Sequence, residues 1–214
     1  VYLASPNKLH IEQARVFLEH GKHVICEKPL SAHAKDVAEL QALAKERGLI
    51  YLEAIMFMHL PQRKLLEEAL KKIGDISVAK IDFCQRSSKY DAYLAGSLPN
   101  IFNPALETGA LMDLGVYCVY PALYLFGKPQ NTLAVSHLLA SGADGSDIVA
   151  MQYPDKLVNL VFSKVGQAGA NTDFQGTNGT VSVESISKLA NISIRYNTVS
   201  YTHLRAHETR SNLV

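Results

Sequence analysis

The first 73 residues contain three short apolar runs, each followed by a segment in which apolar residues recur at helical spacing. The runs are Val1–Ala4, His23–Cys26 and Leu49–Ala54. A glycine closes each helical segment, as is typical of helix C-termini. Short strands that alternate with helices predict a parallel sheet covered by helices on both faces. This pattern assigns residues 1–73 to the α/β class.

The pattern changes after residue 73. Residues 75–86 alternate in polarity, residues 87–104 are rich in turn formers, and six strand-like runs separated by Gly, Asp and Asn come later. The six runs are Thr132–Ala140, Asp147–Tyr153, Leu157–Lys164, Thr172–Gln175, Thr180–Glu184 and Asn191–Tyr196. They predict an α+β domain with a mainly antiparallel sheet over residues 74–199. Residues 200–214 show neither the two-residue period of a strand nor a sustained helical period. We expect them to be a non-native or disordered tail.

One long apolar segment, Gly109–Phe126, precedes these strands and ends at a glycine. Its aspartate, interior glycines and proline favour a buried helix over a membrane span. Asp113 and Tyr117 are four residues apart and therefore lie on one face of that helix. An aspartate in such apolar surroundings needs a partner or a cavity. The alternative is that Tyr117 is a core aromatic residue and Asp113 a local hydrogen-bond acceptor.

Two further candidate sites lie at the ends of the first two predicted strands. Glu27, Lys28 and Pro29 follow the second strand, where the carboxyl ends of parallel strands face a ligand crevice. A solvated charge at a strand end is the competing interpretation. The first strand is followed by Ser5, Pro6, Asn7 and His10. Asn7 is a good N-cap for a helix whose N-terminus attracts anions, although a single N-cap is usually only structural.

Composition narrows the classes of function. Lys and Arg number 21 against 20 Asp and Glu, so the net charge is +1 and nothing favours binding to nucleic acid or to an anionic membrane. The first residues lack the features of a signal peptide, and three widely spaced cysteines are expected to be reduced. We therefore expect a cytoplasmic protein. The histidines show no metal-ligand spacing, so no metal site is expected.

The stretch from ASPNKLH to CEKP, followed downstream by ALMDLGVY, resembles the glucose-fructose oxidoreductase, inositol dehydrogenase and rhizopine catabolism (Gfo/Idh/MocA) family. The resemblance covers roughly residues 1–196. It implies a Rossmann domain, here its C-terminal part (1–73), joined to a truncated α+β domain (74–199) for substrate binding and oligomerisation. The open face of the antiparallel sheet would carry a homo-oligomer.

The resemblance also implies residue roles. Lys28 would be the catalytic lysine beside the nicotinamide, Asp113 the residue that orients the substrate, and Tyr117 the acid/base. The cofactor cleft would be lined by Ser5, Pro6, Asn7, His10, Glu27, Lys28 and Pro29. We expect the Lys28 ammonium to lower the pKa of Tyr117.

The implied activity is hydride transfer between NAD or NADP and a hydroxyl or carbonyl group of a sugar, polyol or diol. A non-catalytic regulatory protein that binds dinucleotides or sugars is the alternative. No GxGxxG turn or cofactor-selecting residue occurs in these residues, so NAD and NADP are not distinguishable. We expect the chain to be an inactive piece of a longer enzyme, without its first strands and its C-terminal end. The family's glycine triplet before ALxDxG is replaced by Glu107-Thr108-Gly109.

Overall fold

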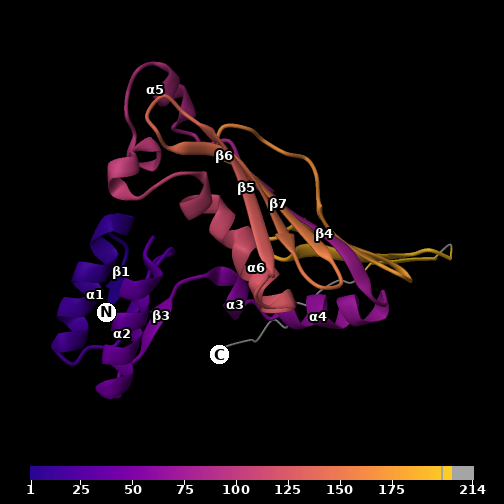
Figure 1. Cartoon of the computed structure of the whole chain (residues 1–214), viewed down its shortest axis with the longest axis horizontal. Helices are drawn as coiled ribbons and strands as arrows, with labels where there is room; N and C mark the ends of the chain where they lie inside the picture. Colours follow the sequence, from indigo (N-terminus) through magenta and orange to yellow (C-terminus); the bar gives the residue numbers. More distant parts are fainter. Residues whose placement is uncertain (199, 204–214) are drawn as a thin grey trace, which may run out of the picture.

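The computed structural model describes residues 1–198 and 200–203. Two units lie side by side in Figure 1: an N-terminal unit in indigo and violet, and a larger unit built on a long sheet. The N-terminal unit consists of β1 (Tyr2–Leu3), η1 (Asn7–Leu9), α1 (His10–Glu19), β2 (Val24–Cys26), α2 (Ala34–Glu46) and β3 (Tyr51–Glu53). Its three strands are parallel, in the order β1-β2-β3, which confirms the predicted parallel sheet.

The prediction that helices cover both faces of this sheet was wrong for the described residues. Helices α1 and α2 pack on one face, where their apolar side chains join the strands in a core. On the other face, Tyr2, Ile25 and Leu52 are 58%, 44% and 46% exposed. The reason is the hand of the connections: two successive right-handed crossovers that advance in one direction place both helices on the same side.

The second unit begins with two helices and ends with strands. Its helices are α3 (Met56–His59), α4 (Gln62–Lys72), α5 (Tyr90–Leu94) and α6 (Val116–Phe126), with short helical turns η2 (Asn100–Phe102), η3 (Pro104–Leu106) and η4 (Leu111–Gly115). Its strands are β4 (Ile76–Cys84), β5 (Asn131–Leu138), β6 (Asp144–Gln152), β7 (Leu157–Ser163), β8 (Thr172–Gly176), β9 (Gly179–Ser185), β10 (Ala190–Tyr196) and β11 (Ser200–His203).

These eight strands form one sheet in the order β11-β10-β9-β8-β4-β7-β6-β5. The sheet is mainly antiparallel, as predicted. The exception is the central pair β4 and β7, which is parallel. Helix α6 packs on β4 and β7, and α4 packs on β9 and β10, so both cover the same face (Figure 1). Alternate strand residues turn buried side chains toward these helices, including Ile81, Leu160 and Phe174.

The last described strand lies at the start of the predicted tail. Ser200–His203 form β11, which pairs antiparallel with β10, with Tyr196 opposite Ser200. A sheet edge presents unpaired backbone groups, and a following segment can pair with them whatever its side-chain pattern. Ser200–His203 are paired in this way, and residues 204–214, the rest of the predicted tail, lie outside the described residues.

The apolar segment Gly109–Phe126 contains a π-helical turn followed by an α-helix. Leu111–Gly115 is a π-helical turn that continues directly into α6. By length and composition, Pro104–Phe126 could also cross a membrane, with a mean hydropathy of 1.4 over its most apolar window. In the structure it packs on the sheet through a buried row that includes Leu114, Cys118 and Ala122.

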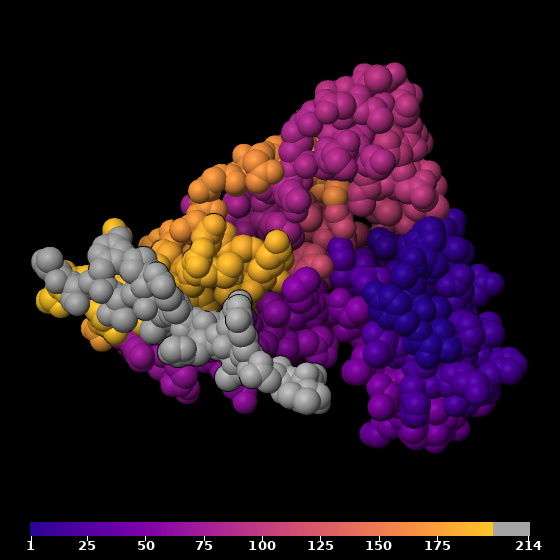
Figure 2. Space-filling model, turned by 180° about the vertical axis from the view of Figure 1, so that it is seen from behind, coloured from indigo at the N-terminus to yellow at the C-terminus, as the bar shows by residue number. Residues whose placement is uncertain are grey.

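The space-filling view shows how the two units meet. In Figure 2 the indigo N-terminal lobe rests against the pink region that contains residues near 100–125. The contact brings the carboxyl ends of the parallel strands to the beginning of the long apolar helix. This meeting point is where the candidate active site lies.

Gly115 allows the apolar helix to approach the sheet closely, because a Cβ atom there would lie 2.8 Å from two carbons of the Phe162 ring. Gly115→Ala is therefore expected to lower the free energy of unfolding by about 1–3 kcal/mol through overpacking. Gly169→Ala is the matched control, because no atom lies within 4 Å of the added Cβ. It should change stability by less than about 0.5 kcal/mol. Equal urea midpoints for the two variants would contradict the prediction.

Candidate active site

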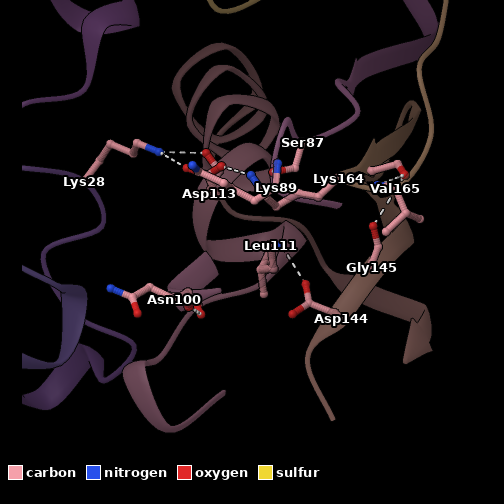
Figure 3. Close-up of polar contacts among 12 residues, drawn as sticks. Lys28, Ser87, Lys89, Asn100, Leu111, Asp113, Asp144, Gly145, Lys164 and Val165 are labelled. Carbon is pink, nitrogen blue, oxygen red and sulfur yellow. Dashed lines mark hydrogen bonds and ion pairs between the residues drawn. The ribbon is translucent and has the colours of Figure 1, made fainter. Parts of the chain in front are cut away.

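Lys28 is the second residue after β2, at the carboxyl end of the parallel sheet, and its side chain reaches the second unit. Its ammonium donates to the Asp113 carboxylate Oδ1 at 2.7 Å and to the Asp113 backbone carbonyl at 2.8 Å (Figure 3). The Lys28 side chain is 13% exposed. The Lys28–Pro29 peptide bond is cis. Of the two expectations for this aspartate, a partner or a cavity, the structure shows a partner.

A second lysine, which the sequence reasoning missed, completes this cluster. Lys164 follows β7, and its ammonium contacts Oδ2 of Asp113 from the side opposite Lys28 (Figure 3). The sequence shows Lys164 only as the last residue of a strand-like run. Its proximity to Asp113 depends on the pairing of β7 with β4 and on the packing of η4, neither of which a local pattern reveals.

The charge of Asp113 is set by these two lysines. Burial alone would raise the pKa of Asp113, but the Lys28 and Lys164 ammoniums outweigh burial and hold the pKa below its usual value. Asp113 is therefore ionised at neutral pH. Its two carboxylate oxygens each contact a lysine ammonium. The resemblance implied instead that this carboxylate orients the substrate.

Tyr117 lies beside the same cluster. The Lys28 ammonium is 5.1 Å from the centroid of the Tyr117 ring, and the Phe83 ring packs edge-on at 5.5 Å between centroids. Burial raises the pKa of Tyr117, and the Asp113 and Glu27 carboxylates add to the rise. The expectation that the pKa of Tyr117 is lowered was wrong, because burial and the two carboxylates raise it. Tyr117 is a neutral phenol at neutral pH.

The residues after β1 form hydrogen bonds that connect the two turns next to the site. His10 is fully buried, with Nδ1 2.8 Å from the Pro29 carbonyl and Nε2 2.8 Å from the Ser5 carbonyl. Its ring joins the turn after β1 to the turn after β2. Ser5 donates its hydroxyl to Gln13 at 2.7 Å.

Asn7 also differs from expectation, because it does not cap a helix. Pro6 occupies the N-cap position of η1, without a side-chain capping bond. The Asn7 amide donates instead to the Glu107 carbonyl at 2.8 Å, in the second unit. Glu107 has φ +56°, a left-handed backbone that glycine adopts readily, which is consistent with the glycine that the family often has near this position.

Glu27 stands between the lysine and the edge strand. Its carboxylate accepts hydrogen bonds from the Tyr2 hydroxyl and, at 3.3 Å, from the Lys28 backbone N–H. Pro29 and Tyr120 line a neighbouring cavity of about 760 Å³, which none of Lys28, Asp113 and Tyr117 lines. The charged cluster and that apolar cavity are separate features of the junction.

Asp144 holds the start of the helix that carries Asp113 and Tyr117. Its Oδ2 accepts from the Leu111 backbone N–H at 2.6 Å, at a helix N-terminus where a carboxylate is favoured. Gly109 leaves space for this contact, because a Cβ at Gly109 would overlap the Asp144 carboxylate. The neighbouring Asp147 is buried, and its Oδ2 has no hydrogen-bond partner among the described residues.

Comparisons with known proteins agree with the fold and with the two-unit division. The family model described as an oxidoreductase family with an NAD-binding Rossmann fold matches residues 1–55. The GFO/IDH/MocA C-terminal domain model matches residues 63–182, more than half of the chain. The chain belongs to the Gfo/Idh/MocA family. This confirms the resemblance drawn from the EKP and ALMDLGVY motifs.

Individual members of the Gfo/Idh/MocA family are similar over most of the chain. A scyllo-inositol 2-dehydrogenase (NADP(+)) of Bacillus subtilis is 42% identical over 196 residues, which cover 92% of this chain and 60% of the relative. Human trans-1,2-dihydrobenzene-1,2-diol dehydrogenase is 30% identical over 185 residues, with coverage of 84% and 53%.

A solved structure gives the same result in three dimensions. The 3-ketoreductase of Actinomadura kijaniata, crystallised with NADP and TDP-benzene, superposes with a TM-score of 0.84 at 26% identity. The match covers 97% of this chain and 65% of the ketoreductase. The chain therefore spans between about half and about two thirds of the length of these three relatives.

Asp147 should make stability depend on pH. Burial raises its pKa from 3.8 to about 6, with a further contribution from Asp144. Between these pH values the folded state binds a proton that the unfolded state has lost, so stability falls as pH rises through this window. Asp147→Asn removes the cost of burying the ionised carboxylate. Its melting temperature relative to the wild type should rise between about pH 4 and pH 6 and then level off; a difference independent of pH would contradict this assignment.

Proposed function

We propose that the protein is an NAD(P)-dependent oxidoreductase that transfers a hydride between a nicotinamide cofactor and a hydroxyl or carbonyl carbon of a sugar, polyol or diol. The observation that carries the proposal is the convergence of Lys28, Asp113 and Tyr117 where the two units meet. A lysine ammonium and a neutral phenol side by side are two proton donors for a single substrate oxygen. A protein that only binds sugars has no need of this pair.

The relatives support the substrate class. The Bacillus relative is named for a polyol and NADP, and the human relative for a diol. Variants of the Actinomadura ketoreductase with one lysine or one tyrosine replaced have been crystallised with NADP and TDP-benzene. Lysine and tyrosine are also the residue types that meet at this site. In this proposal residues 1–73 belong to the dinucleotide-binding domain and residues 74–199 to the substrate and oligomerisation domain.

The residues present fit one end of a dinucleotide. The ends of β1 and β2 lie side by side, and Glu27 offers a carboxylate that could accept hydrogen bonds from ribose hydroxyls. Lys28 places its ammonium beside them. When bound, NAD or NADP supplies the chemistry of hydride acceptance and donation. The free thiols of Cys26, Cys84 and Cys118 agree with the cytoplasmic location that we include in the proposal.

The protein's own residues handle the proton. Because the pKa of Tyr117 is raised, its hydroxyl carries a proton at neutral pH and can deliver it to an oxygen that becomes an alcohol. The Lys28 ammonium can stabilise negative charge on the same oxygen. In the reverse direction, Tyr117 must release its proton to take one from the substrate. The arrangement therefore favours carbonyl reduction near neutral pH and alcohol oxidation at higher pH.

The open face of the long sheet is the proposed surface for homo-oligomerisation. Leu133 and Val135 on β5, Ile148 on β6 and Leu157 on β7 are 70%, 66%, 53% and 57% exposed. The strand register places Val135 opposite Ile148, so apolar side chains adjoin across strands on this face. A contiguous apolar patch on a sheet is typical of a surface that another molecule covers.

Tyr117→Phe tests the catalytic assignment in the full-length protein that contains these residues. The variant keeps the ring but loses the proton donor, so kcat should fall about 10²- to 10⁴-fold, and the cofactor dissociation constant should not change. Tyr120→Phe is the matched control on the same helix, because its hydroxyl bonds Glu53 outside the cluster. It should keep its kcat. A Tyr117→Phe enzyme with more than about a tenth of wild-type kcat would show that Tyr117 is a packing residue.

Val135→Glu tests the oligomerisation surface. The added charge would be buried at an interface and should shift the protein to a smaller species in light scattering after size-exclusion chromatography. Thr132→Glu is the control, because Thr132 lies on the opposite face of the same strand. Unchanged mass for Val135→Glu would place the interface elsewhere.

A further inference from the structure

Lys164 is held in place more firmly than an ordinary strand-end lysine. Its backbone N–H donates to the Gly145 carbonyl at 2.9 Å, and its carbonyl accepts from the Ser87 N–H at 2.8 Å. Its side chain is 7% exposed. Both β6 and the loop after β4 therefore fix the point from which the ammonium approaches Asp113 (Figure 3).

A buried ammonium requires a counter-ion, and Asp113 provides it. Lys28 and Lys164 are the cations that contact the Asp113 carboxylate, one on each oxygen. The elements packed around Asp113 bring further titratable side chains to its vicinity. These are Glu27, Asp82, Cys84, Tyr117, Cys118, Asp144 and Asp147. Among the described residues, none of them makes a hydrogen bond or ion pair with that carboxylate.

The two lysines differ in what surrounds them. Lys28 also lies over the Tyr117 ring and follows Glu27 at the end of the parallel strands, so it faces the place proposed for cofactor and substrate. Lys164 comes from the far side of Asp113, where sheet residues enclose it. Lys28 is therefore the lysine on the side of the proposed substrate, whereas the Lys164 side chain, 7% exposed against 13% for Lys28, lies on the sheet side of Asp113.

We propose that Lys164 is a positioning residue that remains on Asp113 as its permanent counter-ion, so that Lys28 can turn from Asp113 to the substrate oxygen during the reaction. The proposal rests on the proposed function. If Lys28 were the sole partner, its departure would leave a buried carboxylate unpaired, which is strongly unfavourable. With Lys164 in place, Asp113 stays ionised and fixed while Lys28 exchanges partners.

The test replaces Lys164 by Met, which keeps length and removes charge, and by Arg, which keeps charge. In Lys164→Met, loss of the cation should raise the pKa of Asp113 and move the acid limb of the kcat/KM profile upward by about 1–3 pH units. Lys164→Arg should restore the limb. Lys156→Met is the matched control, because Lys156 stands at the other end of β7 and pairs with Asp155. It should leave the profile unchanged.

A double variant separates positioning from folding. In an Asp113→Asn background, Lys164→Met should cause no further shift of the acid limb, because the carboxylate that it serves is gone. An unmoved limb in Lys164→Met, or an equal shift in the Asp113→Asn background, would overturn the proposal.

A measurement without turnover separates this proposal from the proposed function. The Asp113 carboxyl carbon, followed by ¹³C NMR in the 214-residue chain, should titrate at higher pH in Lys164→Met than in the wild type. If the enzyme transfers no hydride to any sugar, polyol or diol but this titration moves, the proposed function fails and the counter-ion role stands. If hydride transfer occurs but the titration is unmoved, the counter-ion role fails alone.

Discussion

One carboxylate between two ammonium groups is the interaction on which the site depends. Asp113 would be costly in an apolar helix packed on a sheet, and two buried lysines would each be costly without it. Together the three charges compensate one another and leave a net positive centre beside Tyr117. The phenol nevertheless remains neutral, because burial and the Asp113 and Glu27 carboxylates raise its pKa.

The three charged residues come from parts of the chain that are far apart in sequence, and the fold brings them together. Lys28 comes just after the parallel strand β2, Asp113 lies in a π-helical turn, and Lys164 follows β7, the strand parallel to β4. Asp144 fixes the beginning of the helix, and Gly115 lets it lie against Phe162. The site is thus formed where ends of secondary structure meet, so its geometry depends on the packing of whole elements.

The sequence predicted those parts of the structure that depend on local pattern. Alternation and glycine stops identified the strands and helices, and the EKP and ALMDLGVY motifs pointed to Lys28, Asp113 and Tyr117, which the structure brings together. Long-range effects were not predictable in this way. The parallel pairing of β4 with β7, the contact of Lys164, and the burial of His10 all depend on tertiary packing. The upward shift of the Tyr117 pKa also depends on tertiary packing, because it arises from burial and from nearby carboxylates.

The junction between the two units has a further consequence. Lys28 bonds Asp113 across it, and Asn7 bonds Glu107, while apolar side chains of both units line a cavity there. Polar contacts, which are directional and sensitive to charge, therefore contribute much of what sets the angle between the units. A change of charge on Asp113 or Lys28 alters the force that holds the units together. The same residues therefore build the site and join the two units.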